Sequence, residues 1–186
     1  EDINPNYRLI QGPKERLGLI HALNSTSSFS FDTETTGLNQ HTASLVGLCF
    51  AINKAEGFYV PIPADFESAV KIVDEFSEPF LNPSIQKVGQ NIKYDITILS
   101  RYDLNINGPL FDTMIAHYLF QPDMKHGMDI LAENYLQYKT ISIESLIGKK
   151  GKNQLSMGDI EPAKIANYGA EDADITLQLK EIFEPK

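Results

Sequence analysis

The stretch that decides the fold runs from residue 31 to residue 38 and reads Phe-Asp-Thr-Glu-Thr-Thr-Gly-Leu. The apolar residues Phe29 and Phe31 come directly before its acids and predict the end of a buried strand. Side chains two positions apart share one face of a strand, so Asp32 and Glu34 point the same way, about 6–7 Å apart along the backbone. Carboxylates this close repel each other unless a proton or a cation lies between them. The pair indicates a cation site, although on its own it also fits a polar strand end before a glycine turn.

The segments around this strand predict an α/β domain. Residues 45–52 and 57–62 are apolar and are joined through the turn at 53–54, so the first three strands are expected to pair antiparallel. Later strands alternate with helices, as in a mixed sheet flanked by helices. The expected strands are 29–33, 45–52, 57–62, 86–89 and 109–111. The first helix is expected to begin at residue 13, and further helices are expected at 66–81, 92–102, 113–120, 128–136, 143–147 and 162–183. Residues 1–12 are expected to be irregular, and residues 148–154 to form an exposed loop.

Two later segments place further acids at helical spacing. Asn91 and Asp95 are four positions apart and share one face of the helix that begins there. Tyr168 and Asp172 have the same spacing on the last helix, where Glu171 falls on another face. Each pair alone also fits a structural role. Asn91 can cap its helix with Asp95 as a solvated acid, and Tyr168 can be a core aromatic near a surface charge.

The composition is that of an ordinary folded domain. The chain has 186 residues, of which 42% are hydrophobic and 22% charged, which suits one domain with a core of its own. No apolar run approaches the roughly 18 residues of a membrane span, and no leader peptide opens the sequence. We therefore expect a single domain over 1–186, cytoplasmic and monomeric, without a membrane; the first residue, Glu1, suggests a piece of a longer protein. Cys49 lies in an apolar run and is expected to be a buried thiol in a reducing compartment.

The formal net charge of −9 argues against a broad coating of duplex DNA, because a basic stripe is the usual footprint of such binding. It does not exclude nucleic acid, since divalent metals held by carboxylates return positive charge to a site. The sequence therefore predicts a small footprint on a few nucleotides, with most of the affinity supplied by another domain. Lys149, Lys150 and Lys152 form a basic cluster that fits either a contact with the DNA backbone or a solvated loop.

Taken in order, the three acidic motifs resemble the exonuclease motifs of the DEDD superfamily, tyrosine subtype. The similarity is closer still to the 3′→5′ proofreading domain of bacterial family A DNA polymerases, and it covers nearly the whole chain after residue 28. The phrases that carry it are Phe-Asp-Thr-Glu-Thr at 31–35, Val-Gly-Gln-Asn-Ile-Lys-Tyr-Asp at 88–95, Phe-Asp-Thr-Met at 111–114, Met-Asp-Ile-Leu-Ala-Glu at 128–133, Gly-Lys-Asn-Gln-Leu at 151–155 and Ala-Glu-Asp-Ala-Asp-Ile-Thr-Leu-Gln-Leu at 170–179.

This resemblance implies an RNase H-like fold and hydrolysis of phosphodiester bonds at a DNA 3′ end, with release of deoxynucleoside monophosphates as proofreading in replication and repair. It also implies that two divalent ions, Mg²⁺ or Mn²⁺, are held by four catalytic acids, Asp32, Glu34, Asp95 and Asp172. Oxygen ligands suit these ions, and two ions about 3.5–4 Å apart stabilise both oxygens of an in-line displacement. Tyr168, with an ordinary pKa of about 10, is expected to position the attacking water, and Glu34 to accept another hydrogen bond from it.

Contacts with the single strand are implied by the same resemblance. The residues expected to line its path are Thr33, Leu38, Gln90, Asn91, Tyr94, Lys125 and Met128. Leu38 is expected to wedge against the terminal base and Tyr94 to offer a stacking surface, although each also fits packing against the core. Two positions depart from the family pattern. Lys125 occupies a position where an arginine is expected, and a lysine cannot make the bidentate contact with phosphate that an arginine makes. Ile143 occupies a position where a phenylalanine is expected, and it offers no ring for a base to stack on. Both departures predict a weaker grip on the strand with the chemistry intact.

The expected partners are a single-stranded or frayed DNA 3′ end and a polymerase domain in the same full-length chain, in a bacterial cytoplasm near the nucleoid. Two alternatives remain open. One is a stand-alone DEDD exonuclease that acts on RNA, and the other is an inactive domain that only braces a polymerase. The presence of all four acids and of Tyr168 argues against the inactive domain.

Overall fold

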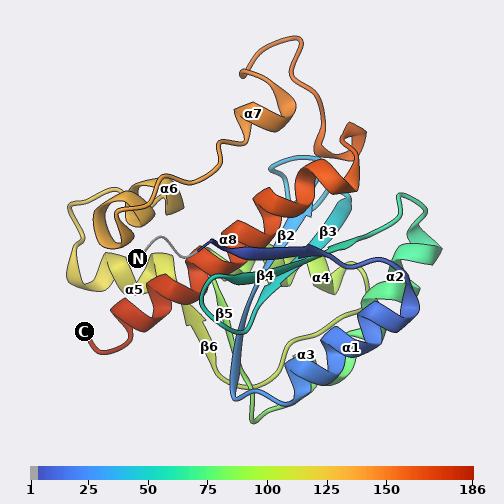
Figure 1. The fold of residues 1–186 in the computed structure, drawn as a ribbon, viewed down its shortest axis with the longest axis horizontal. Helices are drawn as coiled ribbons and strands as arrows, with labels where there is room; N and C mark the ends of the chain where they lie inside the picture. Colours follow the sequence, from blue (N-terminus) through green and yellow to red (C-terminus); the bar gives the residue numbers. More distant parts are fainter. Residues whose placement is uncertain (1–3) are drawn as a thin grey trace.

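The computed structural model describes residues 4–186 and contains one six-stranded sheet with the order β1-β4-β3-β2-β5-β6 (Figure 1). Its strands are β1 (Asn6–Leu9), β2 (Ser28–Thr35), β3 (Leu45–Ala51), β4 (Glu56–Pro61), β5 (Gln86–Gly89) and β6 (Leu110–Asp112). β2, β3 and β4 pair antiparallel, whereas β5 lies parallel to β2 and β6 parallel to β5. The predicted mixed sheet, three antiparallel strands followed by parallel ones, is confirmed.

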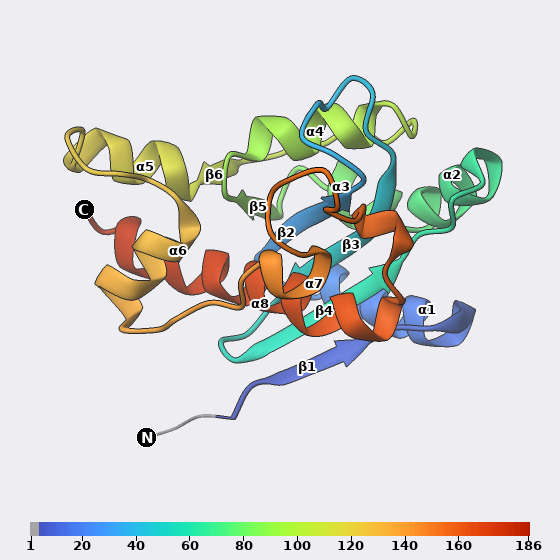
Figure 2. The same ribbon diagram turned by 90° about the horizontal axis from the view of Figure 1, so that it is seen from above.

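Helices cover both faces of this sheet. They are α1 (Gly12–Asn24), α2 (Phe66–Glu75), α3 (Ser77–Leu81), α4 (Ile92–Ser100), α5 (Thr113–Phe120), α6 (Met128–Leu131), α7 (Glu144–Ile147) and α8 (Pro162–Phe183), with a π-helical turn at Ala132–Leu136 and a 3₁₀ turn at Met157–Asp159. Figure 2 shows α4 and α8 on opposite sides of the central strands. The helices α1 to α4 share one core with β2, β3 and β4, and α8 packs on the other face against Cys49 and Tyr59.

Interlocked phenylalanines hold the central strand in place. Phe29 and Phe31 of β2 both meet the ring of Phe80 edge to face, at centroid distances of 5.4 and 4.9 Å. Phe50 of the neighbouring strand stacks on Phe76 at 5.2 Å. All of these side chains are fully buried or nearly so. Because Phe31 points into this core, its neighbour Asp32 must point to the opposite face of the sheet, under α8.

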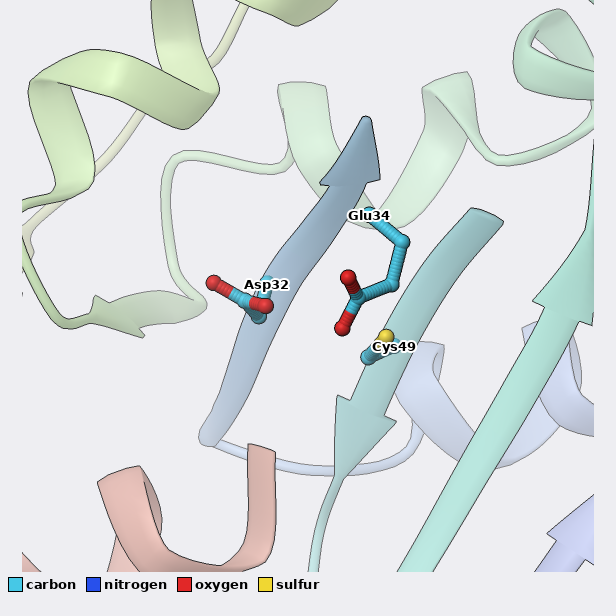
Figure 3. Close-up of side chains that lie close together, drawn as sticks. All are labelled: Asp32, Glu34 and Cys49. Atoms are coloured by element: carbon cyan, nitrogen blue, oxygen red, sulfur yellow. The ribbon is translucent and has the colours of Figure 1, made fainter. Parts of the chain in front are cut away.

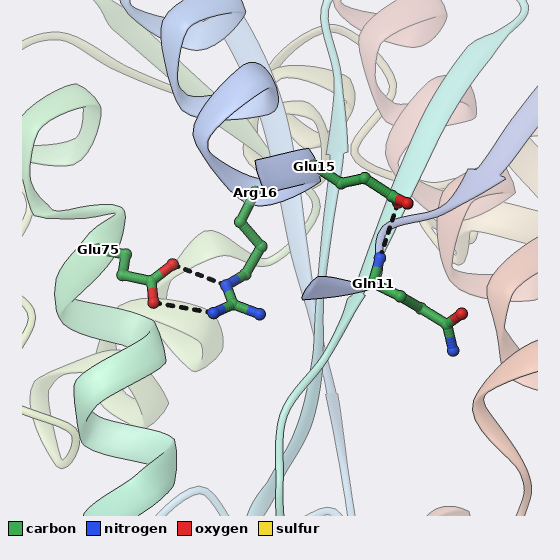
Figure 4. Close-up of polar contacts among 4 residues, drawn as sticks. All are labelled: Gln11, Glu15, Arg16 and Glu75. Atoms are coloured by element: carbon green, nitrogen blue, oxygen red, sulfur yellow. Dashed lines mark hydrogen bonds and ion pairs between the residues drawn. The ribbon is translucent and has the colours of Figure 1, made fainter. Parts of the chain in front are cut away.

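An exposed ion pair joins two of the helices on the phenylalanine side. The guanidinium of Arg16 on α1 donates to both oxygens of Glu75 on α2, at 2.6 and 2.9 Å (Figure 4). Such a bidentate pair fixes orientation more than it adds stability at a wet surface. In the same view, Glu15 accepts a hydrogen bond from the backbone N–H of Gln11 at 2.9 Å, which satisfies one donor at the start of α1.

Three elements differ from the sequence-based expectations. Residues 6–9 form the edge strand β1, which pairs parallel with β4, so the expected irregular lead-in is wrong there; residues 1–3 lie outside the described part of the chain. The expected helix 66–81 is two helices, because Pro79 has no N–H for the carbonyl of Glu75 and its ring would clash with that carbonyl. The expected helix 128–136 turns π-helical at Ala132. Among residues 4–186, no helix is both long and apolar enough to cross a membrane.

Candidate active site

Three elements that are far apart in the sequence bring the four predicted acids together. Asp32 and Glu34 stand on β2, with Glu34 at a bulge in its pairing with β3. Asp95 stands in the first turn of α4, and Asp172 stands in the middle of α8. Glu34 and Asp95 are buried, with 6% and 2% of their surface exposed. The charges of Asp32, Asp172 and Asp95 all raise the pKa of Glu34, so the fold places the four acids near one another.

Thr33 ties the strand of the first two acids to the helix of the third. Its backbone N–H and its hydroxyl both donate to Oδ1 of Asp95, at 3.0 and 2.6 Å. The backbone of Thr33 was expected to line the path of the substrate. Its N–H and its hydroxyl instead both donate to Asp95. The carboxylate of Asp95 is thereby fixed relative to β2, which is the precision that a metal ligand requires.

Helix α8 approaches the sheet closely at Gly169. A Cβ atom at this position would lie 2.6 Å from Sγ of Cys49 and 3.3 Å from Oε1 of Glu34, so a larger residue would displace both. The close approach carries Tyr168 and Asp172, which are half-buried, over the acids of β2. The two lie four positions apart on one helix face, and the charge of Asp172 acts on Tyr168.

Side chains of β2 and β3 form a cluster whose composition suits a metal ion. Figure 3 shows Asp32, Glu34 and Cys49 turned toward one another, and one ligand atom of each lies within 4.8 Å of the others. Oε1 of Glu34 is buried and has no hydrogen-bond partner, which is rare for a buried carboxylate oxygen. An oxygen-rich cluster with an unsatisfied buried oxygen fits a hard divalent ion such as Mg²⁺ or Mn²⁺. No sequence motif signalled that Cys49 lies beside the acids, although its burial was expected.

Burial and mutual repulsion raise the pKa of every clustered carboxyl group. Burial raises the pKa of Asp32 to about 7. Burial, followed by the charges of neighbouring carboxylates, raises the pKa of Glu34, Asp95 and Asp172 well above the ordinary range. Burial and the charge of Asp172 raise the pKa of Tyr168, so its phenol stays protonated near neutral pH. Without a cation the cluster therefore retains protons, which a bound divalent ion has to displace.

A cavity of about 520 Å³ opens beside the acids of α8. It is lined by Met128, Asp129, Glu133, Lys139, Thr140, Ile141, Ser142, Ile143, Tyr168 and Asp172. Met128 and Ile143, which sequence reasoning placed near the substrate, are in this lining. Segment 139–143 supplies five consecutive residues, of which sequence reasoning had singled out only Ile143, because nothing in its composition marks it as a wall.

The other expected substrate contacts lie outside this lining. Leu38 is 93% exposed in the loop after β2, so it does not pack on the core and is free to meet a ligand. Tyr94 is half-buried, and its hydroxyl lies 2.6 Å from Oγ1 of Thr35 and 2.7 Å from the carbonyl of Gly37, so it braces the glycine turn. Lys125 is exposed in the loop before α6.

Gln90 and Asn91 are held by the protein itself. The side-chain amide of Gln90 donates to the carbonyl of His126 at 2.7 Å and accepts from the hydroxyl of Thr113. Asn91 has a left-handed backbone with φ of 58°, and its side chain makes no capping bond. Asn91 therefore occupies the N-cap position of α4, but the interpretation that its side chain caps the helix is wrong.

Asp112 provides the cap that Asn91 does not. Its Oδ1 accepts from the backbone N–H groups of Asn91 and Met114, and more distantly from that of Ile115, at 3.0, 2.9 and 3.3 Å. Its Oδ2 accepts from the N–H of Ile92 at 2.9 Å. One carboxylate therefore caps both α4 and α5. The second cap needed the parallel pairing of β5 with β6, which the motif does not contain.

A six-stranded mixed sheet of this order, with acids on its central strand and on two helices, is the RNase H-like fold of the DEDD exonucleases. The chain belongs to the 3′-5′ exonuclease domain family of family A DNA polymerases, whose family model matches residues 7–186. It is thus a nuclease domain by descent, and the expected family is confirmed.

Similar sequences are those of bacterial DNA polymerases I. The chain is 38% identical to that of Borreliella burgdorferi over 98% of its own length, and 35% identical to that of Pseudomonas aeruginosa over 90%. It spans only about a fifth of the length of these relatives, 20% and 19%. The relatives are longer polymerases in which the matched region is one part of the chain.

Solved structures confirm the fold. Brucella melitensis NrnC superimposes with a TM-score of 0.68 at 21% identity, covering 87% of this chain and 74% of its own. Trypanosoma brucei RNase D, solved in complex with RNA U12, gives a TM-score of 0.77 at 15% identity, covering 98% of this chain and 63% of its own. At these identities the likeness extends to the fold and not to the substrate.

Divalent ions are expected to stabilise this domain more at pH 8 than at pH 5.5. The folded-state pKa of Asp32, about 7, exceeds its unfolded value of about 3.9, so without metal the folded state binds the extra proton and its stability falls as pH rises from about 4 to 7. Mn²⁺ needs the deprotonated ligands and reverses this loss. At a hundredfold excess over its dissociation constant, Mn²⁺ should raise Tm by roughly 5–10 °C at pH 8 and by less at pH 5.5.

Thermal melting with Mn²⁺ or with a chelator at the two pH values measures this difference. Asp32→Asn, which removes the titrating carboxyl while keeping its shape, is the control and should reduce the dependence on pH. An Mn²⁺ effect of equal size at both pH values would contradict the linkage of ion binding to these carboxyls.

Proposed function

We propose that residues 1–186 act as the proofreading exonuclease domain of a longer DNA polymerase, hydrolysing the last phosphodiester bond at a DNA 3′ end and releasing a deoxynucleoside monophosphate. The observation that carries this proposal is the convergence of the four acids on one site beside a cavity that Tyr168 and Asp172 help to line. Membership of the exonuclease family supports the reaction class. The polymerase relatives support DNA as the substrate and a polymerase domain as the neighbour in the full-length chain.

In this proposal the residues that hold two divalent ions are Asp32, Glu34, Asp95 and Asp172. Bound there, Mg²⁺ or Mn²⁺ would supply positive charge for the phosphate and lower the pKa of a coordinated water. The unsatisfied oxygen of Glu34 and the fixed carboxylate of Asp95 support this assignment. The raised pKa values mean that the four acids resist full ionisation on their own, so binding of the ions and ionisation of the ligands would be coupled.

Tyr168 has a positioning role in the proposed reaction. Its phenol stays protonated, because burial and the charge of Asp172 raise its pKa, so it cannot act as a general base near neutral pH. The hydroxyl belongs to the same helix face as Asp172, and its oxygen can accept a hydrogen bond from the attacking water. Glu34 lies on the facing strand and offers a second acceptor. Water held by two groups in this way is oriented for in-line attack.

The isolated domain is expected to bind single-stranded DNA weakly. The formal net charge is −9, and the lysine at position 125 and the isoleucine at position 143 replace stronger phosphate and base contacts expected of the family. Exposed Leu38 supports a wedge against the terminal base. We therefore propose that the polymerase part of the full-length chain delivers the frayed 3′ end to this site.

The direct test is degradation of 5′-labelled single strands of matched DNA and RNA sequence, with Mg²⁺ or with a chelator. The expected result is stepwise release of deoxynucleoside monophosphates from the DNA strand, abolished by the chelator. Preferential degradation of the RNA strand would favour the exoribonuclease instead. A protein that degrades neither strand and shows no Mn²⁺ binding by calorimetry would be an inactive bracing domain.

A further inference from the structure

Glu171 is a fully buried carboxylate with no part in the proposed chemistry, although it lies directly beside Asp172 on α8. Its Oε1 accepts a hydrogen bond from the hydroxyl of Tyr138 at 2.5 Å, and its Oε2 accepts one from the backbone N–H of Ile141 at 2.7 Å. Both donors belong to segment 137–142, which contains neither helix nor strand. A single side chain of α8 therefore holds a segment of irregular backbone.

The segment held by Glu171 is also a wall of the cavity. Residues 139–143 line it consecutively, together with Tyr168 and Asp172 of α8. Irregular backbone lacks the regular ladder of hydrogen bonds that fixes a helix or a strand, so its position depends on its tertiary contacts. Lys139 in this wall brings a positive charge to a cavity whose other charged lining residues are the acids Asp129, Glu133 and Asp172. The position of the wall therefore decides how closely that charge and the reacting acids enclose a ligand.

We propose that Glu171 is a positioning residue, which holds the wall 139–143 at a fixed distance from Asp172 and so sets the grip on the end of a nucleic acid strand. This inference rests on the proposed function of the site. Adjacent residues on a helix point about 100° apart. Asp172 can therefore reach into the cavity while Glu171 reaches the segment that borders it. One rigid helix thus sets both the reacting acid and the wall that faces the ligand.

A second buried carboxylate on the same helix provides a matched comparison. Asp174, with 1% of its surface exposed, accepts a hydrogen bond from the hydroxyl of Tyr7 at 2.8 Å and from the backbone N–H of Ala55 at 2.9 Å. These are the same kinds of donor that Glu171 binds, but they belong to β1 and to the turn between β3 and β4, and none of them lines the cavity. Tyr7→Phe and Tyr138→Phe therefore each remove one hydroxyl that donates to a buried carboxylate of α8.

The experiment compares Tyr138→Phe with Tyr7→Phe in steady-state cleavage of a 3′-labelled oligodeoxynucleotide with Mg²⁺. Tyr138→Phe is expected to raise KM about five- to tenfold and to leave kcat within about twofold, since one hydrogen bond of the wall is lost while the acids are untouched. Tyr7→Phe is expected to leave both constants unchanged, with a similar loss of thermal stability. Glu171→Ala should raise KM further. Glu171→Gln should restore most of the grip, because its amide can accept from Ile141 and donate to Tyr138.

Hydrogen exchange gives a readout that does not need cleavage. The amide of Ile141 is expected to exchange faster in Tyr138→Phe than in the unchanged protein, and at the unchanged rate in Tyr7→Phe. Equal KM values for the two tyrosine variants would overturn the positioning role. If the unchanged protein degrades no strand, the proposed function fails separately, and anisotropy of a labelled strand with Ca²⁺ replaces KM. Equal affinities of the two variants in that measurement, or no binding at all, would then overturn the inference.

Discussion

Asp32→Ala is expected to lower the rate of 3′-end cleavage by about a thousandfold or more. Metal ions stabilise the charge of such a transition state by several kcal/mol, and a loss of about 4 kcal/mol corresponds to roughly a thousandfold in rate. The fold should survive, because Asp32 is a half-buried acid among other acids and its pKa of about 7 reflects the cost of burying its charge. Single-turnover release of nucleotides gives the rate. Melting in the presence of a chelator should give an unchanged or higher Tm.

Two further variants separate this effect from a general change of charge. Glu67→Ala removes an exposed acid from α2, away from the site, and should leave the rate unchanged. Asp32→Ala combined with Asp95→Ala should cost little more than the single change, since groups that act as a unit are not additive. Cleavage by the double variant within about tenfold of the unchanged rate would show that these acids do not hold the catalytic ions.

Asp112→Ala is expected to destabilise the domain by roughly 2–4 kcal/mol, because a helix cap contributes about 1–2 kcal/mol and this carboxylate caps two helices. Loss of the cap should loosen the first turn of α4, and this turn carries Asp95. The variant should therefore also bind Mn²⁺ more weakly. Urea unfolding followed by circular dichroism measures the change in the free energy of unfolding, and calorimetry measures the ion.

Asp65→Ala is the matched control for the double cap. Asp65 caps only α2, through one bond to the backbone N–H of Ser68 at 2.9 Å, and its loss should cost about 1 kcal/mol without changing the affinity for Mn²⁺. Equal losses of stability in the two variants would mean that Asp112 serves one helix only.

The sequence was most informative where local pattern and tertiary structure agree. Strand 86–89 and helices 113–120 and 162–183 have the predicted bounds, because each carries its own start or stop signal or apolar pattern. Strand and helix periodicities placed the acids and Tyr168 on shared faces, whereas their roles were implied by the resemblance to the exonuclease family. Pro79 could also have revealed the break between α2 and α3 from the sequence, since its missing N–H is a local property.

The remaining features depend on contacts between distant segments. Edge strand β1 is polar and short, and the hydrogen bond from Tyr7 to Asp174 helps to hold it in place, which no local pattern reveals. The same is true of the double cap by Asp112 and of the wall held by Glu171. Gly169 looked like an ordinary helix glycine, and only the packing of α8 on β3 shows why a side chain does not fit there.

The site also has a consequence for how the chain is made. Ser30 on β2 donates to the carbonyl of Ala173 on α8, a contact between residues 143 positions apart. Closing so long a loop costs conformational entropy, and a chain leaves the ribosome amino end first. Within this domain, Asp32 and Glu34 are therefore synthesised well before Asp172, and they cannot meet it until α8 has emerged. The proposed ion site can therefore be completed only after α8 has packed on the sheet, which makes it one of the last features of the domain to form.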